Sequence, residues 1–223
     1  MKKILLSILS ISLIISCNNG VNAKKSPPAE GEYIGIDISH HQGVVDWNSV
    51  AKTDIKFVYH KATEGASHQD RKYRENMKQA KNVGLLVGSY HFYSLKSTAT
   101  AQFENFKKQT NNISQDLIPV VDVEEVLRGK ININDLNLLL QLIENEFQVK
   151  PMIYTSERVF YTYFDKPKYK DYLFWISNYK RRPLCRYTLW QCSERFQLSG
   201  FKGRVDKNII AIADFNKILF PKQ

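Results

Sequence analysis

The stretch Leu117-Ile118-Pro119-Val120-Val121-Asp122-Val123-Glu124-Glu125 decides how the rest of the chain is interpreted. Its apolar, β-branched start is typical of a buried strand. Side chains along a strand alternate between two faces, so Asp122 and Glu124 should project from one face, with Cα atoms about 6.6 Å apart. Two carboxyl groups at that reach suit glycosidic bond cleavage, where one acid protonates the leaving oxygen and the other stabilises positive charge. Two acids at this spacing are usually ordinary surface residues at a solvated strand end. A catalytic role for them therefore needs support from the rest of the sequence.

The N-terminal segment has the pattern of an export signal. Two lysines near the start precede an apolar run that ends at Ile15 and is too short to cross a bilayer as a helix. The residues Ile14-Ile15-Ser16-Cys17 resemble the lipobox of bacterial lipoproteins, which implies cleavage before Cys17 and acylation of its thiol. We therefore expect a signal peptide over residues 1–16 and a lipidated flexible tether over 17–30, with the exported protein anchored to a bacterial membrane in the cell envelope. The alternative is a plain secretory signal in which Cys17 is incidental.

The chain is strongly basic, with a formal net charge of +10. Removal of the signal takes away Lys2 and Lys3, which leaves +8 (10 minus 2). Such a charge attracts anionic partners, among them nucleic acid and anionic cell-wall polymers. No zinc-finger, RNP or helix-turn-helix pattern is present, and an exported chain rarely meets nucleic acid, so no nucleic-acid function is expected.

Strand patterns and helix patterns alternate over residues 31–223, which we expect to form one domain. Helical spacing of apolar residues occurs over 72–82, 98–109 and 134–147, and Asn134 is a plausible N-cap of the last of these. The expected strands are Tyr33–Ser39, Asp54–Ala62, Leu85–Tyr93, Leu117–Glu125, Lys150–Thr155, Tyr172–Ser177, Tyr187–Ser193 and Val205–Ile210.

This alternation predicts parallel strand pairing, in a (β/α) barrel or a doubly wound sheet. The connections between the last three strands are too short for crossover helices, so these strands should be irregular or linked as hairpins. The best fit is an α/β fold, an irregular eight-stranded TIM-like barrel with few helices after the last strands.

Active sites of such barrels lie at the C-terminal ends of the strands. Four acids are expected to meet at this rim: Asp37, Asp122, Glu124 and Asp206. Aromatic and polar residues that fall late in strands are Tyr90, Phe92, Tyr154, Trp175 and Gln191. Rings offer sugars an apolar face and acids bind their hydroxyls, so this composition favours a sugar-cleaving groove. Each aromatic residue taken alone would more often be core packing.

Six segments, in order, resemble the motifs of glycoside hydrolase family 25, the Chalaropsis-type lysozymes. The resemblance covers roughly residues 33–208. Its segments are Gly35–Gly43 followed by Asp46-Trp47, Phe57–Gly65, Gly88–Phe92, Pro119–Glu124, Pro151–Thr155, and Leu189-Trp190-Gln191 followed by Gly203–Asn208. Cys192, the segment Ile176–Tyr179 and Lys207 depart from the usual pattern, which puts outer-subsite contacts in doubt.

The resemblance implies a lysozyme, or N-acetylmuramidase, that hydrolyses the β-1,4 bond between N-acetylmuramic acid and N-acetylglucosamine in peptidoglycan glycan strands. It implies Glu124 as the general acid and Asp122 as the group that stabilises the 2-acetamido arm or the oxocarbenium charge. Asp37 and Asp206 match the remaining acids of the groove. The substrate-binding candidates are Lys61, Glu64, Tyr90, Phe92, Tyr154, Trp175 and Gln191.

Burial and neighbouring acids should raise the pKa of Glu124, and we expect Asp122 to stay ionised. The spacing of the two acids leaves retention and inversion open, and we favour a substrate-assisted route with the acetamido oxygen as nucleophile. Two other functions also stay open: a lipoprotein that binds wall glycan without cutting it, and a hydrolase of another amino-sugar polymer such as chitin.

No cofactor or metal is expected, because the five histidines and the cysteines show no zinc-site spacing. His40 and His41 should point to opposite faces of a strand end. Cys185 and Cys192 should be free thiols, since an extended strand between them would hold them too far apart for a disulfide. We expect a monomer.

Overall fold

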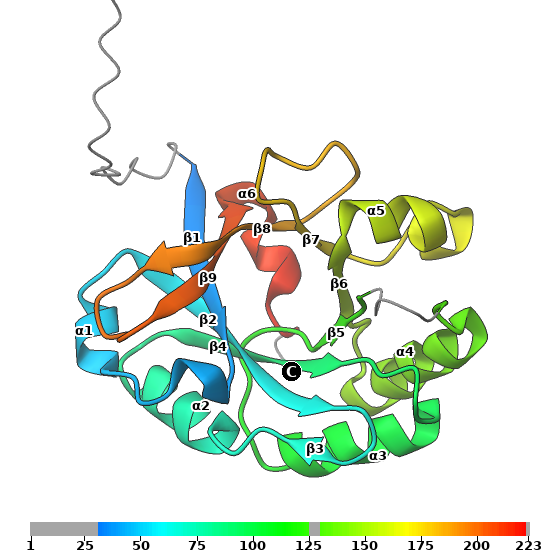
Figure 1. Cartoon of the computed structure of the whole chain (residues 1–223), viewed down its shortest axis with the longest axis horizontal. Coiled ribbons are helices and arrows are strands. Elements are labelled where there is room, and N and C mark those ends of the chain that lie inside the picture. Colours follow the sequence, from blue (N-terminus) through cyan, green and yellow to red (C-terminus); the bar gives the residue numbers. More distant parts are fainter. Residues whose placement is uncertain (1–30, 125–129, 222–223) are drawn as a thin grey trace, which may run out of the picture.

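The computed structural model describes residues 31–124 and 130–221, and a curved β-sheet organises this part of the chain (Figure 1). Its strands, in chain order, are β1 (Glu32–Ile38), β2 (Ile55–Glu64), β3 (His68–Gln69), β4 (Leu86–Phe92), β5 (Val120–Asp122), β6 (Met152–Ser156), β7 (Phe174–Ser177), β8 (Leu189–Gln197) and β9 (Arg204–Ala211). The α-helices are α1 (Trp47–Ala51), α2 (Tyr73–Asn82), α3 (Ala99–Thr110), α4 (Ile133–Phe147), α5 (Glu157–Val159) and α6 (Ile212–Phe215). Shorter turns of helix are η1 (His40–Gln42), η2 (Phe160–Phe164), η3 (Pro167–Tyr169) and η4 (Asn216–Ile218).

Eight of the strands close into a barrel. The neighbours run in the order β1-β9-β8-β7-β6-β5-β4-β2, and β1 also pairs with β2, which joins the two ends. Pairing is parallel from β1 through β2, β4, β5, β6 and β7 to β8, whereas β9 is antiparallel to both β8 and β1. Because β9 runs the other way, its N-terminal end lies at the same rim as the C-terminal ends of the parallel strands. The expected irregular eight-stranded α/β barrel is therefore confirmed.

The longest helices, α2, α3 and α4, cover the outside of the barrel beside its first strands, and shorter helical segments follow β6 and β9. In Figure 1 these three helices lie along the lower outer side of the sheet; α3 and α4 follow the parallel strands β4 and β5, and α2 follows the short antiparallel strand β3. Helix α4 turns Leu136, Leu139, Leu140 and Ile143 inward, all at most 1% exposed, which is the apolar stripe that its sequence spacing predicts. Between β7 and β8, residues 178–188 form no helix, and β8 and β9 form a hairpin, as the short late connections indicate.

The barrel interior is filled by alternate residues of the strands. Val120, Met152, Trp175 and Leu189 are at most 2% exposed and belong to one apolar cluster, which the C-terminal Phe215 and Ile218 also join. A larger cluster packs the outer strand faces against the helices. Since the apolar residues fill one part of the barrel, the polar residues at the C-terminal rim stand above a solid floor.

Two local expectations were wrong. The strand predicted over 117–125 is only β5, because Pro119 has no N–H and Leu117 pairs instead with Leu219. Glu124 therefore lies beyond the strand rather than within it. The N-cap of α4 is Asn132, whose Oδ1 accepts the N–H of Asp135 at 3.3 Å, and not Asn134. Two short elements, α1 and β3, were not expected from the sequence.

The two cysteines of the domain are free thiols, as the strand between them predicts. Cys185 is buried, and Cys192 is half-buried on β8 with its Sγ at 3.5 Å from the carbonyl oxygen of Lys207.

Candidate active site

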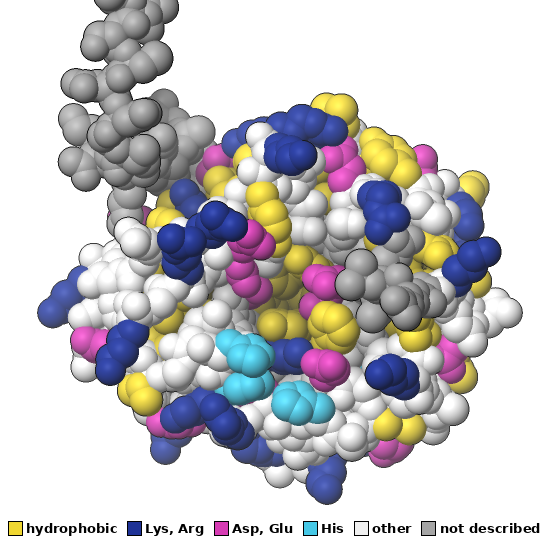
Figure 2. Space-filling model, viewed as in Figure 1, with side chains coloured by type: hydrophobic (Ala, Val, Ile, Leu, Met, Phe, Trp, Pro, Cys, Tyr) yellow, Lys and Arg dark blue, Asp and Glu magenta, His cyan; other side chains and the backbone are white. Residues whose placement is uncertain are grey.

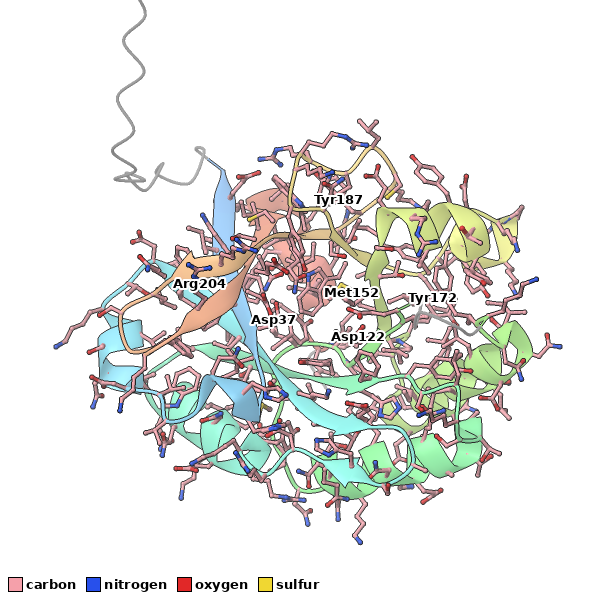
Figure 3. All side chains as sticks on the ribbon, viewed as in Figure 1. Asp37, Asp122, Met152, Tyr172, Tyr187 and Arg204 are labelled. Carbon is pink, nitrogen blue, oxygen red and sulfur yellow. The ribbon has the colours of Figure 1, made fainter. Side chains whose placement is uncertain are left out.

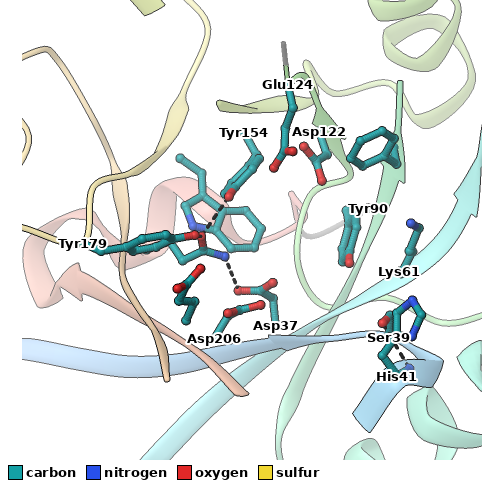
Figure 4. A pocket seen from close by; sticks show the side chains of 14 residues that line it. Asp37, Ser39, His41, Lys61, Tyr90, Asp122, Glu124, Tyr154, Tyr179 and Asp206 are labelled. Atoms are coloured by element: carbon teal, nitrogen blue, oxygen red, sulfur yellow. Dashed lines mark hydrogen bonds between the residues drawn. The ribbon is translucent and has the colours of Figure 1, made fainter. Parts of the chain in front are cut away.

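A cavity of about 270 Å³ opens at the C-terminal rim of the barrel. Figure 2 shows the hollow in the middle of the face, with acidic side chains around it and histidines along its lower edge. Fourteen residues line it: Asp37, Ser39, His41, Lys61, Tyr90, Phe92, Asp122, Glu124, Tyr154, Trp175, Tyr179, Gln191, Glu194 and Asp206 (Figure 4).

Asp122 and Glu124 both point into this cavity from the end of β5 (Figure 4). The backbone stays extended after the strand because the N–H of Val123 donates to the carbonyl of Tyr154 at 2.9 Å and Thr155 Oγ1 donates to the carbonyl of Val123 at 2.7 Å. This keeps the alternation of faces, so Val123 is buried on the outer side while its two acidic neighbours share the inner side.

The two acids differ in their surroundings. Asp122 is 8% exposed, and its Oδ1 has no hydrogen-bond partner among the described residues. Burial, and then the charge of Glu124, raise the pKa of Asp122 well above its usual value, while the ammonium group of Lys61 lowers it. Glu124 lies exposed at the mouth of the cavity; desolvation by the surrounding walls raises its pKa and Lys61 opposes this.

The raised pKa of Glu124 agrees with the sequence expectation. The pKa of Asp122 is also raised, by burial and then by the charge of Glu124, which opposes the ionised form expected for it in the free protein. Asp122 lies deeper than Glu124 at the end of β5, and its Oδ1 lacks a hydrogen-bond partner among the described residues, so its charged form is poorly solvated.

Asp37 and Asp206 form a second acidic pair, on directly opposite positions of β1 and β9. Asp37 is 6% exposed, and its Oδ2 accepts hydrogen bonds from Asn208 Nδ2 at 2.8 Å and Gln191 Nε2 at 2.9 Å. Burial raises the pKa of both carboxyl groups. The neighbouring Asp37 raises the pKa of Asp206 further, whereas the hydrogen bond between the two groups lowers the pKa of Asp37. Because two close carboxyl groups resist double ionisation, the pair retains a proton more readily than exposed acids do.

A polar network fixes the floor beside this pair. Gln191 Oε1 accepts from the hydroxyl of Tyr154 at 2.8 Å and from that of Tyr179 at 2.7 Å. Asn208 Oδ1 accepts from the indole N–H of Trp175 at 2.8 Å. Because the oxygen of each amide accepts from these aromatic side chains, the NH₂ groups are oriented toward Asp37, and the aromatic rings are held in place around the acids.

Lys61 supplies a positive charge at the opposite wall. Its Nζ lies 2.7 Å from Glu64 Oε2 and 4.9 Å from the centre of the Phe92 ring. Glu64 itself does not line the cavity, so it reaches the site only through Lys61.

The segment after β1 turns into η1 and brings His41 to the rim. Ser39 and Gln42 form a capping box, with Ser39 N–H donating to Gln42 Oε1 at 2.8 Å, and Gly43 follows with φ of 72°. His40 docks on buried Asp70, whose Oδ2 lies 2.8 Å from both the backbone nitrogen and Nδ1 of His40. The expectation that His40 and His41 point to opposite faces is wrong, because they lie on a helical turn with ring centres 4.0 Å apart.

Ten of the eleven acids and substrate-binding candidates that the sequence singles out line the cavity, and Glu64 is the exception. Sequence reasoning missed Ser39, His41, Tyr179 and Glu194. Ser39 and His41 fall within the first motif, so their place next to the end of β1 was the available signal. Cys17 lies outside the described residues.

Residues 31–124 and 130–221, the part of the chain that the structure describes, show neither a metal cluster nor a membrane-spanning helix. There, no group of three or more His, Cys, Asp or Glu side chains is arranged to hold a metal ion. Likewise, no helix there combines the length and the apolar character needed to cross a bilayer.

Comparison with known proteins agrees with this geometry. Residues 36–201 match the model of the family described as glycosyl hydrolases family 25. The uncharacterized protein YegX of Escherichia coli K12 is 34% identical over 82% of this chain and 71% of its own, and the autolytic lysozyme of Clostridium acetobutylicum is 33% identical over 77% of this chain and 54% of its own. The structure of a bacterial lysozyme from Streptomyces coelicolor superposes with a TM-score of 0.71 at 27% identity, over 79% of this chain and 90% of that one. The chain is thus a glycoside hydrolase that belongs to glycosyl hydrolases family 25.

Proposed function

We propose that this enzyme is a lysozyme that hydrolyses the β-1,4 bond between N-acetylmuramic acid and N-acetylglucosamine in peptidoglycan. The observation that carries the proposal is the placement of Asp122 and Glu124, which enter one cavity together at the end of β5. Family membership and relatives named as lysozymes support peptidoglycan as the substrate.

Glu124 is proposed as the general acid. It stands at the mouth of the cavity, where a glycosidic oxygen can reach it, and its raised pKa keeps a proton available. The charge of Lys61 opposes this rise.

Asp122 is proposed to hold the 2-acetamido group of the substrate. Its buried Oδ1 lacks a partner among the described residues, and an acetamido N–H is a donor of the right kind. A hydrogen bond from this N–H favours the ionised carboxylate, so substrate binding would lower the pKa that burial raises. The acetamido oxygen, oriented in this way, would then act as the nucleophile.

Asp37 and Asp206 are proposed to stabilise charge from below the reacting sugar. The amides of Asn208 and Gln191 hold Asp37 in place, so its position does not depend on the substrate. Tyr90, Phe92, Tyr154, Trp175 and Gln191 would bind the sugars, with Lys61 held in place by Glu64. No cofactor takes part in this scheme, and the enzyme is proposed to act as a monomer.

Incubation of residues 31–223 with purified peptidoglycan and, in a separate reaction, with chitin tests the proposal. New reducing ends on muramic acid would support it. New ends from chitin with none from peptidoglycan would indicate another amino-sugar polymer. Binding to peptidoglycan without any new ends would indicate a wall-binding protein.

We also propose that the protein is exported and carries lipid on Cys17, a residue outside the described part of the chain. The resemblance of residues 14–17 to a lipobox supports this. A Cys17→Ala variant should leave the membrane fraction and keep its specific activity. A variant that still sediments with membranes after a high-salt wash would contradict the proposal.

A further inference from the structure

The connection between β7 and β8, residues 178–188, carries an exposed cluster that the catalytic scheme does not use. Lys180, Arg181, Arg182 and Arg186 are all exposed, and Leu184 lies among them with 76% of its surface exposed. In Figure 1 this connection forms the loop at the upper edge of the molecule, and Figure 2 shows dark blue side chains along that edge. We refer to these five residues as the basic loop.

The backbone of the basic loop is held rigidly. Glu157 accepts the N–H of Leu184 at 2.7 Å and the side-chain amide of Asn178 at 2.6 Å, and it pairs with Arg181 at 3.2 Å. The residues on either side of Leu184, Pro183 and Cys185, are buried. Their burial anchors the chain and directs the Leu184 side chain outward, so its exposure is built into the loop.

The positive charge of the basic loop is only partly neutralised. Arg181 pairs with Glu157, and Arg182 pairs with Glu32 at 2.6 Å. Lys180 makes no ion pair with any described residue. Arg186 is held by the protein itself, because it donates to the carbonyl oxygens of Tyr169, Lys170 and Tyr172 and lies 4.9 Å from the centre of the Phe174 ring (Figure 3 shows the crowded side chains in this region).

The basic loop contacts the start of the domain, through the ion pair between Arg182 and Glu32. Glu32, the partner of Arg182, is the first residue of β1, and the described chain begins one residue earlier. The cavity lies in the middle of the face shown in Figure 2 and the basic loop at its upper edge, so a surface that contacts the loop need not cover the cavity.

We propose that the basic loop docks this domain on an anionic lipid surface, with Leu184 inserted at the headgroup boundary and the surrounding cations facing lipid phosphates. An exposed apolar side chain on a loop with a net positive charge matches a membrane interface, which is both anionic and apolar. An anionic wall polymer would use the cations but would leave Leu184 in water. The inference goes beyond the proposed lysozyme activity and does not need lipid on Cys17.

Vesicle sedimentation with residues 31–223 tests the inference. This part can be used alone because every strand pairing that closes the barrel lies between residues 32 and 211. The domain should bind phosphatidylcholine vesicles that contain phosphatidylglycerol. It should bind pure phosphatidylcholine vesicles much less, and binding should fall in high salt. Lys180→Ser should weaken binding about fivefold, the usual contribution of one cation near such a surface. Leu184→Ser should weaken it about tenfold, through loss of buried apolar area.

Matched controls are available elsewhere on the surface. Leu138→Ser removes a leucine that is 43% exposed on α4, and Lys78→Ser removes an exposed lysine from α2. Both should bind vesicles like the unmodified domain. Equal binding by the Leu184→Ser variant and its control would overturn the inference, as would loop variants that lose binding to purified wall polymer but keep binding to vesicles. A domain that bound vesicles and cut no peptidoglycan would refute the proposed function and leave docking supported.

Discussion

At the scale of single residues, the site depends on two carboxyl groups with different depths. Glu124 is exposed at the cavity mouth, whereas Asp122 is 8% exposed at the end of β5. A proton donor must reach the leaving oxygen, and a group that holds the substrate in place gains from a dry, fixed position. The difference in depth therefore supports different roles for two neighbouring acids of similar chemistry.

Replacement of Glu124 by Gln should abolish most of the activity and leave folding intact. The amide keeps the shape of the side chain but has no acidic proton, and general acid catalysis is typically worth about 10²–10⁴-fold. Turnover of peptidoglycan and thermal unfolding should be measured on the same preparation. A variant that keeps more than about a tenth of the activity would show that Glu124 is not the acid.

Replacement of Asp122 by Asn should make the protein inactive but more stable at neutral pH. Burial raises the pKa of Asp122 in the folded state above its value in the unfolded chain, so the folded state binds the proton more tightly. The contribution of Asp122 to stability is thus fully present below the unfolded pKa and is lost as pH rises toward the folded value, at about 1.4 kcal/mol for each pH unit. In the Asp122→Asn variant, the free energy of unfolding should therefore fall less as the pH rises.

Urea unfolding at several pH values from 4 to 8 would measure that difference, with Asp214→Asn as a control on an acid that pairs with Lys217 at the surface. Equal pH slopes for the Asp122→Asn variant and the unmodified enzyme would argue against the buried, unpartnered state of Asp122.

At the scale of elements, the sequence predicts those parts of the fold that depend on local pattern. Helix α4 and the strands β2 and β4 follow from apolar spacing, because burial of one face determines both the pattern and the structure. The elements that were missed are short and depend on tertiary contacts. Helix α1 has five residues, and β3 has two and exists only by pairing with the end of β2.

The same distinction applies to the site. Residues on strands could be placed at the rim from the barrel pattern, which is why the four acids were found together. Tyr179 and Glu194 could not, because Tyr179 follows β7 in an irregular loop and Glu194 lies where the pairing of β8 with β9 shifts register. Neither position can be derived from alternation along a regular strand.

The barrel strands also require small residues at set positions, and Gly88 of β4 is one of them. A Cβ atom there would lie 2.5 Å from Tyr59 Cε1 and 2.8 Å from Leu117 Cβ, both in the packed barrel interior. Gly88→Ala should therefore destabilise the protein by about 1–3 kcal/mol through overpacking. Gly203→Ala is the matched control, since a Cβ there meets no atom within 4 Å. The control should be neutral or slightly stabilising. Chemical unfolding of both variants would decide, and equal stabilities would contradict the packing argument.

At the scale of the whole molecule, buried titratable groups lie in two separate regions. The raised carboxyl groups surround the cavity at the barrel rim. Two buried histidines, His60 and His91, lie instead between the strands and the outer helices, next to Trp47 and Phe106. The acids make the folded state more stable as pH falls from neutral, and the histidines make it less stable, so the pH dependence of stability reflects both regions.

His60 gives the clearest test of the second region. It is 1% exposed, and neither ring nitrogen has a hydrogen-bond partner among the described residues. Burial lowers its pKa to about 3, and the charge of Asp70 opposes this only in part. The folded state thus binds a proton more weakly than the unfolded chain. Stability that is fully present above about pH 6.5 is lost as pH falls toward 3, by at most about 1.4 kcal/mol for each pH unit.

A His60→Leu variant should therefore lose less stability than the unmodified protein between pH 6.5 and pH 4. Leucine fills a similar space, carries no titratable group and removes no hydrogen bond that the described residues make with the ring. Met77→Leu, at a position 2% exposed on α2, controls for a change of packing without a change of charge. Free energies of unfolding in urea, taken at half-unit steps of pH, give the slopes. If His60→Leu and Met77→Leu lose stability in parallel as the pH falls, protonation of His60 does not contribute to acid unfolding.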